Sequence, residues 1–258
     1  VTSTANPLVK AARSLHQTKA RRESNLFVAE GQKLIIDALD VAWPPEMIFA
    51  IEPNRDNDAG AQVAARVRAA GGDVIWTNGA VMEKLARRDN PQTMIGVFDQ
   101  RLAPLSTMAS GTLVALEAPR DPGNIGTVVR TADAAGASGV VLVGPSADPF
   151  GIEAVRATMG SIFHIPIARV SAEEFFSFLD TYGGTVVGTH LRATDDLRAL
   201  RPSEPQLLVM GTEQAGLSDA MAERCGQLAK IPMAGRADSL NLAVATGLAL
   251  FELRRPFL

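Results

Sequence analysis

The sequence has few of the residues that build covalent or metal-linked sites. It contains one cysteine, Cys225, which excludes an internal disulfide and a cysteine-based zinc site, so a reducing cytoplasm is the expected setting. Its three histidines, His16, His164 and His190, lie far apart in the chain, and none has the spacing of a helical histidine pair. We therefore expect no metal site.

Long apolar runs and several common enzyme motifs are also missing. No stretch approaches the roughly 18 consecutive apolar residues of a membrane span, and the first residues do not form a basic-then-apolar secretory pattern. The sequence has no GxGxxG after a predicted strand, no GxxxxGK[ST] and no GxSxG. We therefore expect a soluble protein without a dinucleotide fingerprint, a P-loop or a hydrolase nucleophile elbow.

The positive charge is unevenly distributed. The net charge of −3 does not by itself favour a nucleic-acid partner, yet the first 22 residues contain no acid and five basic residues: Lys10, Arg13, Lys19, Arg21 and Arg22. A helical pattern over 6–20 carries most of them. This pattern is equally consistent with a solvated charged helix and with an arm that contacts RNA phosphates.

Strand-like and helix-like segments alternate along the 258 residues, which predicts an α/β protein with a largely parallel sheet. The first part has predicted strands at 26–30, 47–51, 74–76 and 94–98, with helices at 31–39, 59–70 and 81–87. The second part has predicted strands at 112–116, 140–143, 185–188, 206–210 and 228–231, with a helix at 125–135 and another opening at a capping box, 171–174. The least regular stretch separates them, so we predict a domain at 1–100, a linker at 101–111 and a domain at 112–258.

Three segments share the order strand, polar turn, helix: 121–130, 210–218 and 231–251. Ligands in open α/β sheets bind beyond the carboxyl ends of the strands, so we predict that the three turns form one site. In the last segment Ser239 is the predicted N-cap of a helix. The residues Leu240, Val244, Leu248 and Phe251 recur at helical spacing and are the predicted core face.

The predicted site is polar but has no nucleophile and no metal ligand set. It contains Asn124, Arg130, Glu213, Ser239 and Asn241. Such a set suits positioning and charge stabilisation. Each residue also has a simpler interpretation, because Asn124, Glu213 and Ser239 are typical helix-capping residues and Arg130 is typical of a solvated helix surface.

The motifs match a known family in order and with compatible spacing. They are Asp-Pro-Gly-Asn124 with Arg130-Thr-Ala-Asp-Ala-Ala-Gly, then Val155-Arg156-Ala-Thr-Met-Gly, Gly211-Thr-Glu213-x-x-Gly-Leu-Ser, and Ile231-Pro-Met with Ser239-Leu-Asn241. They resemble the SpoU/TrmH-type RNA 2′-O-ribose methyltransferases of the SPOUT class. The N-terminal part, with Asn6-Pro-Leu-Val-Lys10 and Phe27-Val-Ala-Glu-Gly31, is similar to that family's substrate RNA-binding domain. One departure is Thr212, where the family often has Asn.

The resemblance implies a C-terminal α/β domain with a deep trefoil knot that holds S-adenosylmethionine. By family position, the cofactor-binding residues are Gly211, Ile231 and Leu240, with the loop residues Thr189, His190 and Leu191 on one side. The implied reaction is methyl transfer to a ribose 2′-hydroxyl. Ribosomal RNA is the expected substrate, because a separate N-terminal domain of this kind usually accompanies it. Resistance to a ribosome-directed antibiotic is a further role that the resemblance leaves open.

The resemblance also implies residue roles. Arg130 is expected to stabilise the forming oxyanion, since a permanently protonated arginine is a poor general base. Asn124 positions the ribose, Glu213 holds Asn124 or Arg130, and Ser239 and Asn241 line the pocket. Arg156 is expected to contact substrate phosphate. The RNA-binding candidates of the N-terminal domain are Lys10, Arg13, Arg21 and Arg22, which are named for their charge.

The expected assembly is a cytoplasmic homodimer in which Arg130 of one subunit completes the partner's site. The alternatives are a tRNA ribose methyltransferase and a noncatalytic RNA-binding module of the same fold. A nicotinamide-dependent oxidoreductase is disfavoured by the missing glycine fingerprint.

Overall fold

The computed structural model describes residues 1–52, 59–86, 90–201, 203–212 and 214–258. The chain forms two compact units. The first consists of Val1–Gln100 and Asp148–Phe163, and the second of Arg101–Ala147 and His164–Leu258. The domain boundaries predicted from the sequence differ from the compact units in two segments. Residues 148–163 group with the N-terminal residues, and 101–111, predicted as a linker, belong to the second unit.

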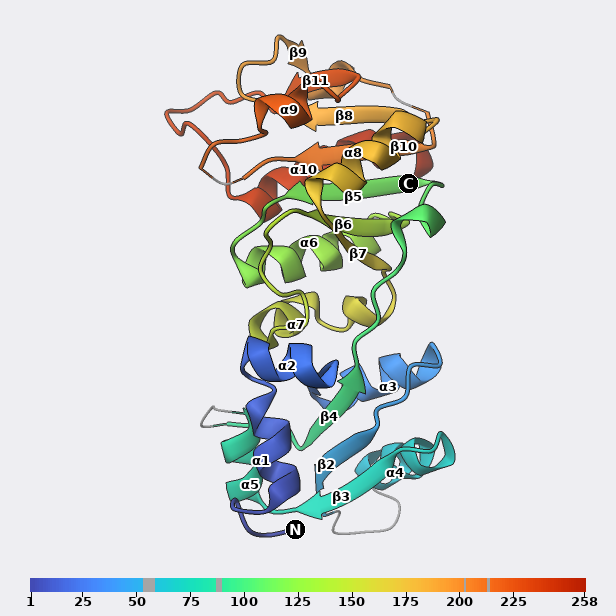
Figure 1. Ribbon diagram of the computed structural model, residues 1–258, viewed down its shortest axis with the longest axis vertical. Helices are drawn as coiled ribbons and strands as arrows, with labels where there is room; N and C mark the ends of the chain where they lie inside the picture. Colours follow the sequence, from blue (N-terminus) through green and yellow to red (C-terminus); the bar gives the residue numbers. More distant parts are fainter. Residues whose placement is uncertain (53–58, 87–89, 202, 213) are drawn as a thin grey trace. The chain divides into compact units, whose positions relative to one another are not determined.

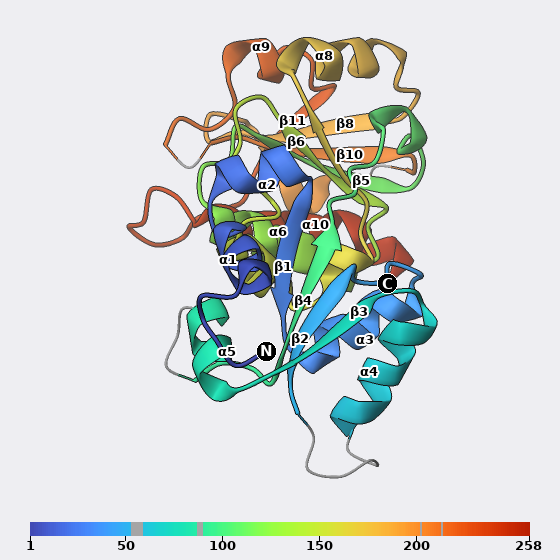
Figure 2. The ribbon, with the colours of Figure 1, turned by 60° about the horizontal axis from the view of Figure 1, so that its bottom comes forward.

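The first unit is built on a four-stranded sheet. Its strands are β1 (Leu26–Glu30), β2 (Met47–Ile51), β3 (Asp73–Thr77) and β4 (Met94–Asp99), in the order β1-β4-β2-β3. Its helices are α1 (Pro7–Ser14), α2 (Thr18–Ser24), α3 (Gln32–Asp40), α4 (Ala59–Ala69), α5 (Gly79–Ala86) and α7 (Ile152–Thr158), with a 3-10 turn η2 (Ser161–Phe163). Helices α1 and α5 cover one face of this sheet and α3 and α4 the other (Figure 2). Only β2 and β3 are parallel, whereas β4 runs antiparallel to both of its neighbours.

The single helix predicted over 6–20 is wrong, because two helices occupy the region. After α1 the chain makes tight turns, in which the amides of His16 and Gln17 bond to the carbonyls three residues back. The Leu15 carbonyl, which a continuous helix would use internally, accepts a hydrogen bond from Nη1 of Arg21 at 2.8 Å. The side chain of Arg21 thus helps to fix the break between the helices.

Aromatic packing explains why 148–163 joins the first unit. The ring of Phe150 lies 5.0 Å from that of Phe27, and the ring of Phe163 lies 5.0 Å from Phe98 and 5.3 Å from Trp43. All five side chains are buried. Such rings contribute much of the apolar area of a small core, which a division based on the order of strands and helices does not reveal.

The second unit contains a seven-stranded sheet in which every recorded pairing is parallel. Its strands are β5 (Thr112–Glu117), β6 (Gly139–Val143), β7 (Ile167–Val170), β8 (Thr185–Thr189), β9 (Asp195–Asp196), β10 (Gln206–Met210) and β11 (Gln227–Lys230). The order is β7-β6-β5-β10-β8-β11-β9, so β10 is inserted between β5 and β8 (Figure 1). The predicted α/β class is confirmed, and so is the parallel sheet of the second unit. For the first unit the prediction of a largely parallel sheet is wrong, because β4 lies between β1 and β2 and runs antiparallel to both.

Helices cover both faces of this sheet. They are α6 (Pro122–Ala134), α8 (Ala172–Thr181), α9 (Asp219–Ala222) and α10 (Leu242–Arg254), with short 3-10 turns η1 (Leu105–Thr107), η3 (Leu197–Ala199) and η4 (Arg255–Phe257). Helices α8 and α9 lie on one face, and α6 and α10 on the other (Figure 2). The capping box predicted at the start of α8 is confirmed, with both Ser171 and Glu174 bonding reciprocally. None of the helices in the described ranges is both long and apolar enough to cross a membrane.

Helix α10 buries a different stripe from the predicted one. The side chains of Leu242, Ala249, Leu250 and Leu253 are buried. By contrast, Val244, Leu248 and Phe251, which the periodicity assigned to the core, are 52%, 51% and 44% exposed. Because this helix is apolar on most of its sides, periodicity alone does not identify the stripe that faces the sheet.

Candidate functional site

A cavity of about 300 Å³ lies beyond the carboxyl ends of β8, β10 and β11. It is lined by Thr189, His190, Leu191, Met210, Gly211, Thr212, Gln214, Ala215, Gly216, Lys230, Ile231, Met233, Asp238, Ser239, Leu240, Leu242 and Ala245. All six residues predicted to bind a cofactor are in this set. Three loops far apart in the sequence therefore form one cavity at the strand ends, where open α/β sheets bind ligands.

One wall of the cavity depends on two glycines. A Cβ atom at Gly211 would lie 2.0 Å from the backbone carbon of Gly216 and 2.1 Å from the Leu217 nitrogen. Gly216 has φ +71°, a conformation that side chains disfavour. Thr212 and Gly216 exchange two backbone hydrogen bonds of 2.9 and 3.0 Å. A close backbone wall of this kind presents rigid peptide groups to a ligand.

The opposite wall follows β8. The hydroxyl of Thr189 donates to the sulfur of Met210 at 3.4 Å, which ties the ends of two neighbouring strands together. The backbone amide of His190 donates to the Ala229 carbonyl at 2.9 Å, and its Nδ1 accepts from the Arg192 amide at 3.1 Å. The imidazole therefore supports the local turn, while Leu191, 69% exposed, stands at the rim.

Two of the predicted catalytic side chains lie in direct contact. The amide nitrogen of Asn241 donates to the side-chain oxygen of Asn124 at 3.0 Å, across 117 positions of sequence. Asn241 is also the N-cap of α10, because its Oδ1 accepts from the amides of Ala243 and Val244. The predicted N-cap at Ser239 is therefore wrong by two residues, and Ser239 instead lines the cavity.

The start of α6 explains the placement of Asn124. Asp121 is the N-cap, and its Oδ1 accepts from the backbone amide of Asn124 at 2.6 Å. The capping role considered for Asn124 thus belongs to Asp121. This leaves the Asn124 side chain directed to Asn241, so that the first and last motifs meet at the N-terminal ends of two packed helices, α6 and α10.

Arg130 lies two turns further along α6. Its side chain is exposed, and within the described residues it makes no hydrogen bond or ion pair. It is not among the residues that line the cavity. The chain thus brings together Asn124 and Asn241 but leaves Arg130 exposed to solvent. Of Ser239 and Asn241, both predicted to line the pocket, only Ser239 is among the lining residues. Glu213, the remaining predicted catalytic residue, lies outside the described residues.

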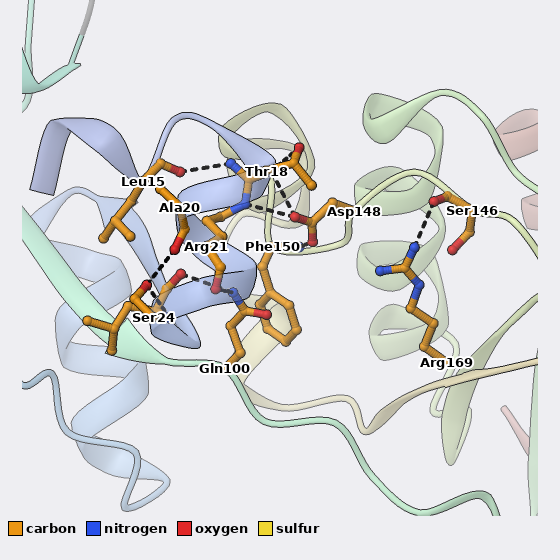
Figure 3. Close-up of polar contacts among 11 residues, drawn as sticks. Leu15, Thr18, Ala20, Arg21, Ser24, Gln100, Ser146, Asp148, Phe150 and Arg169 are labelled. Atoms are coloured by element: carbon orange, nitrogen blue, oxygen red, sulfur yellow. Dashed lines mark hydrogen bonds and ion pairs between the residues drawn. The ribbon is translucent and has the colours of Figure 1, made fainter. Parts of the chain in front are cut away.

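Two arginines that were predicted to contact RNA instead bond to other residues of the first unit. Arg21 is 3% exposed; its Nε donates to Asp148 at 2.8 Å and its Nη2 to the hydroxyl of Thr18 at 3.1 Å (Figure 3). Arg156 donates to the buried carboxylate of Glu30 at 2.7 Å and to the Ala86 carbonyl at 2.8 Å. These contacts hold both guanidinium groups in the fold. The prediction of direct phosphate contact therefore does not fit Arg21, and Arg156 reaches solvent over only about a third of its side chain.

The other predicted RNA contacts differ in exposure. Lys10 on α1 and Arg22 on α2 are exposed, whereas Arg13 is half-buried. The Nε of Arg13 is buried and has no hydrogen-bond partner in the described part of the chain. Lys10 and Arg22 therefore remain the better placed of these residues for a solvent-side partner.

Some residues around the cavity were missed by sequence reasoning. Lys230 and Asp238 line it and carry opposite charges. Glu117, at the end of β5, accepts hydrogen bonds from the Ser218 amide and hydroxyl at 2.9 and 2.5 Å. The signal available for Asp238 was its position in the polar loop directly before Ser239, and for Glu117 its position at a strand end.

The single cysteine packs against the core of the second unit. A Cβ atom at Gly188 of β8 would lie 2.7 Å from the sulfur of Cys225. Burial, and then the nearby Glu117 carboxylate, raises the pKa of the Cys225 thiol to about 12. A thiol with this pKa is protonated at neutral pH and is not a nucleophile.

The cavity fits a nucleoside with a charged tail. Peptide groups and apolar side chains such as Ile231, Leu240 and Met210 suit a planar heterocycle, while Lys230 and Asp238 suit ionic groups. The absence of a Cβ at Gly211 leaves the close backbone wall intact. In the described part of the cavity lining there is no reactive nucleophile, so the arrangement favours positioning of two partners over covalent catalysis.

Comparison with known proteins agrees with these observations. Residues 111–251 match the SpoU rRNA Methylase family, and residues 6–96 match the MRM3-like substrate binding domain. The chain is 32% identical over 257 residues to the 23S rRNA (guanosine(2553)-2′-O)-methyltransferase RlmP of Bacillus subtilis (strain 168), covering 98% of both chains.

Solved structures are similar over the full length. A crystal structure of an AdoMet-bound rRNA methyltransferase from Sinorhizobium meliloti is 51% identical with a TM-score of 0.93, covering 100% of this chain and 98% of that one. The SpoU methyltransferase AviRb from Streptomyces viridochromogenes, in complex with the cofactor AdoMet, is 28% identical with a TM-score of 0.86, covering 98% of both.

Proposed function

The chain belongs to the SpoU rRNA Methylase family, and we propose that it transfers a methyl group from S-adenosylmethionine to a ribose 2′-hydroxyl of RNA, with ribosomal RNA as the substrate. The observation that carries this proposal is the meeting of three distant loops, 189–191, 210–216 and 231–240, around one cavity beside the Asn124–Asn241 contact. The cavity suits the cofactor, and the contact suits the acceptor ribose.

The residues of the chain have distinct tasks in this reaction. S-adenosylmethionine supplies an electrophilic methyl group on a sulfonium. The ribose hydroxyl forms a C–O bond as the C–S bond breaks, and it loses its proton, so negative charge develops on its oxygen. A positively charged group near that oxygen lowers the barrier. Arg130 can donate hydrogen bonds to the oxygen while remaining protonated, and a substrate phosphate is then the acceptor for the proton.

Asn124 and Asn241 position the ribose in this scheme. The hydrogen bond from Asn241 holds the Asn124 side chain in place at the start of α6. We propose that the two amides together position the substrate ribose or backbone. Ser239, at the cavity rim, supplies a further hydroxyl. Glu213 keeps the role implied by the family resemblance, as an orienting residue for Asn124 or Arg130.

The location of Arg130 favours a dimer. It lies on the outer face of α6, outside the cavity of its own chain. On the neighbouring helix α10, the exposed apolar side chains Val244, Leu248 and Phe251 form a stripe, and a Cβ at Gly247 would lie only 3.5 Å from Thr131 of α6. Exposed apolar stripes typically mark protein interfaces. We propose that two copies pair through α6 and α10, and that Arg130 of each serves the partner's cavity.

Mixing two inactive variants tests this arrangement. Arg130→Ala removes the arginine, and Gly211→Val blocks the cavity wall. In a mixed dimer, the cavity of the Arg130→Ala subunit is intact and faces Arg130 of the other subunit, so activity returns to roughly a quarter of wild type at equal mixing. If Arg130 acts within its own chain, neither site of the mixed dimer is complete and no activity returns.

The first unit is the proposed RNA-binding part. Its match to a substrate binding domain and its exposed basic side chains, including Lys10 and Arg22, support this assignment. A ribosomal RNA substrate also places the protein in the compartment that contains ribosomes, which we propose is the cytoplasm.

The proposed fold detail is a deep trefoil knot in the second unit. It is supported by the order of the sheet, in which β10 lies between β5 and β8, and by the return of loop 231–240 to the ends of β8 and β10. Such threading is rare among folds. It accounts for a cavity formed by three loops at one edge of the sheet.

Methyl transfer from labelled S-adenosylmethionine tests the reaction. The enzyme is given unmodified ribosomal RNA, assembled ribosomal particles and tRNA separately, and the products are digested to nucleosides. We expect label in a 2′-O-methyl nucleoside from the ribosomal samples. Label only in tRNA would move the assignment to a tRNA ribose methyltransferase. Cofactor binding without transfer to any RNA would favour the noncatalytic module.

A further inference from the structure

Asp238 is a charged residue of the cavity to which the family resemblance assigned no role. It lies in the loop 231–240 and lines the cavity, whose only other lining residue with a fixed charge, among those described, is Lys230. The Asp238 side chain is exposed, and within the described ranges its carboxylate makes no hydrogen bond or ion pair. The cavity thus contains a carboxylate that no described neighbouring cation neutralises.

The ligand of the proposed function supplies a complementary group, and the inference rests on that function. S-adenosylmethionine carries a sulfonium, an α-ammonium and an α-carboxylate, so its net charge is positive. A carboxylate accepts hydrogen bonds but cannot donate them, and an ammonium has three N–H donors. A sulfonium has no N–H group. Of the two cationic groups, only the ammonium can therefore form an ion-paired hydrogen bond with Asp238; the ribose hydroxyls and the adenine amino group can also donate to a carboxylate, but they are neutral.

We propose that Asp238 binds the α-ammonium of the methionine moiety and thereby selects the orientation of the cofactor in the cavity. The neutral adenine then lies toward the backbone and apolar walls, which include Gly211, Ile231 and Leu240. This division of the cavity follows the usual pattern, in which apolar surface binds a heterocycle and a few polar groups fix its direction.

The interaction acts on binding and not on the chemical step. The ammonium keeps its charge throughout methyl transfer, so Asp238 stabilises the ground state and the transition state equally. Loss of the carboxylate is expected to raise the KM for S-adenosylmethionine with little change in kcat. The demethylated product, S-adenosylhomocysteine, retains the ammonium and is expected to lose affinity to the same extent.

Calorimetric binding to three ligands tests the proposal without any RNA. The variant is Asp238→Asn, which keeps the size and shape of the side chain. The ligands are S-adenosylmethionine, S-adenosylhomocysteine and 5′-methylthioadenosine, which lacks the amino-acid moiety. The matched control is Asp180→Asn, because Asp180 is an exposed carboxylate on α8 that does not line the cavity.

Asp238→Asn is expected to raise the Kd of both amino-acid-bearing ligands about 10-fold, or about 1.4 kcal/mol, and to leave the Kd of 5′-methylthioadenosine unchanged. Asp180→Asn is expected to change none of the three. An unchanged Kd for S-adenosylhomocysteine in Asp238→Asn overturns the proposal, and an equal loss for 5′-methylthioadenosine shows a structural effect on the loop and also overturns it. Failure of the wild-type protein to bind S-adenosylmethionine would refute the proposed function itself.

Discussion

Replacing Arg21 by methionine distinguishes a residue that holds the fold from one that contacts RNA. Methionine keeps an unbranched apolar stem but removes the guanidinium, whose three nitrogens donate to Asp148, Leu15 and Thr18. The matched control is Arg22→Met, one residue later on the same helix, where the side chain is exposed.

The magnitude follows from the burial of the pair. The side chains of Arg21 and Asp148 are 4% and 13% exposed, so Arg21→Met leaves a carboxylate that is largely removed from water and has no cation beside it. Breaking a buried pair from one side costs about 3–5 kcal/mol. Arg22→Met is expected to change the free energy of unfolding by less than about 0.5 kcal/mol.

Urea unfolding followed by tryptophan fluorescence measures the difference. Both tryptophans of the chain, Trp43 and Trp76, belong to the first unit, so their fluorescence reports the unit that contains Arg21. With a urea slope of about 2 kcal/mol per molar, Arg21→Met lowers the unfolding midpoint by roughly 2 M. RNA affinity is measured separately at several salt concentrations, where loss of one phosphate contact lowers the salt slope by about 0.9 for duplex and 0.7 for single strands.

A second substitution separates charge from packing. Asp148→Asn keeps the oxygen that accepts from the Phe150 amide but removes the negative charge, so the double variant Arg21→Met/Asp148→Asn is expected to be more stable than Arg21→Met alone. The reasoning is refuted if Arg21→Met unfolds at the wild-type midpoint. It is equally refuted if Arg21→Met, studied well below its unfolding midpoint, loses a phosphate contact while Arg22→Met does not.

Three further predictions concern the second unit. Asn241→Ala removes a helix cap and is expected to lower the free energy of unfolding by about 1 kcal/mol. A double-mutant cycle with Asn124→Ala, measured by denaturation and by methyl transfer, gives the coupling between the two side-chain amides, and zero coupling in both assays would exclude their joint role. Because the pKa of Cys225 is raised to about 12 in the folded state, the thiol ionises at lower pH in the unfolded chain, and the free energy of unfolding is expected to fall as the pH rises from about 9 to 12. This fall is expected to be smaller in Cys225→Ala, and an identical pH profile in the two proteins would contradict the raised pKa. Leu248→Asp with Phe251→Asp is expected to yield monomers in sedimentation experiments and to abolish methyl transfer while preserving cofactor binding, and a dimer of unchanged affinity would place the interface elsewhere.

The motif order made the three loops of the cavity accessible to prediction. The six residues assigned to cofactor binding all line one cavity, because each follows a strand of a parallel sheet whose carboxyl ends share one edge. The capping box at Ser171 and the parallel sheet of the second unit were likewise predictable from local patterns, whereas the same pattern wrongly predicted a largely parallel sheet in the first unit. The catalytic roles of Arg130, Asn124, Glu213, Ser239 and Asn241 stay predictions, as does cofactor binding by the six cavity residues.

Predictions that depended on the environment of single side chains were less accurate. A buried arginine and a solvated one look alike in sequence, so nothing separated Arg21 from Arg22 until Asp148, 127 positions away, was placed beside it. Helix α10 is apolar on most sides, so its spacing predicted a helix but not which stripe it buries.

The sequence by itself determined the α/β class, the positions of the turns and the family, because these follow from periodicity and short motifs. Only the tertiary structure decided that 148–163 packs with the N-terminal residues, that Asn241 bonds to Asn124, and that Asp238 lines the cavity without a described partner. The physical reason is that burial, pairing and desolvation depend on which distant residues the folded chain brings within a few ångströms of one another.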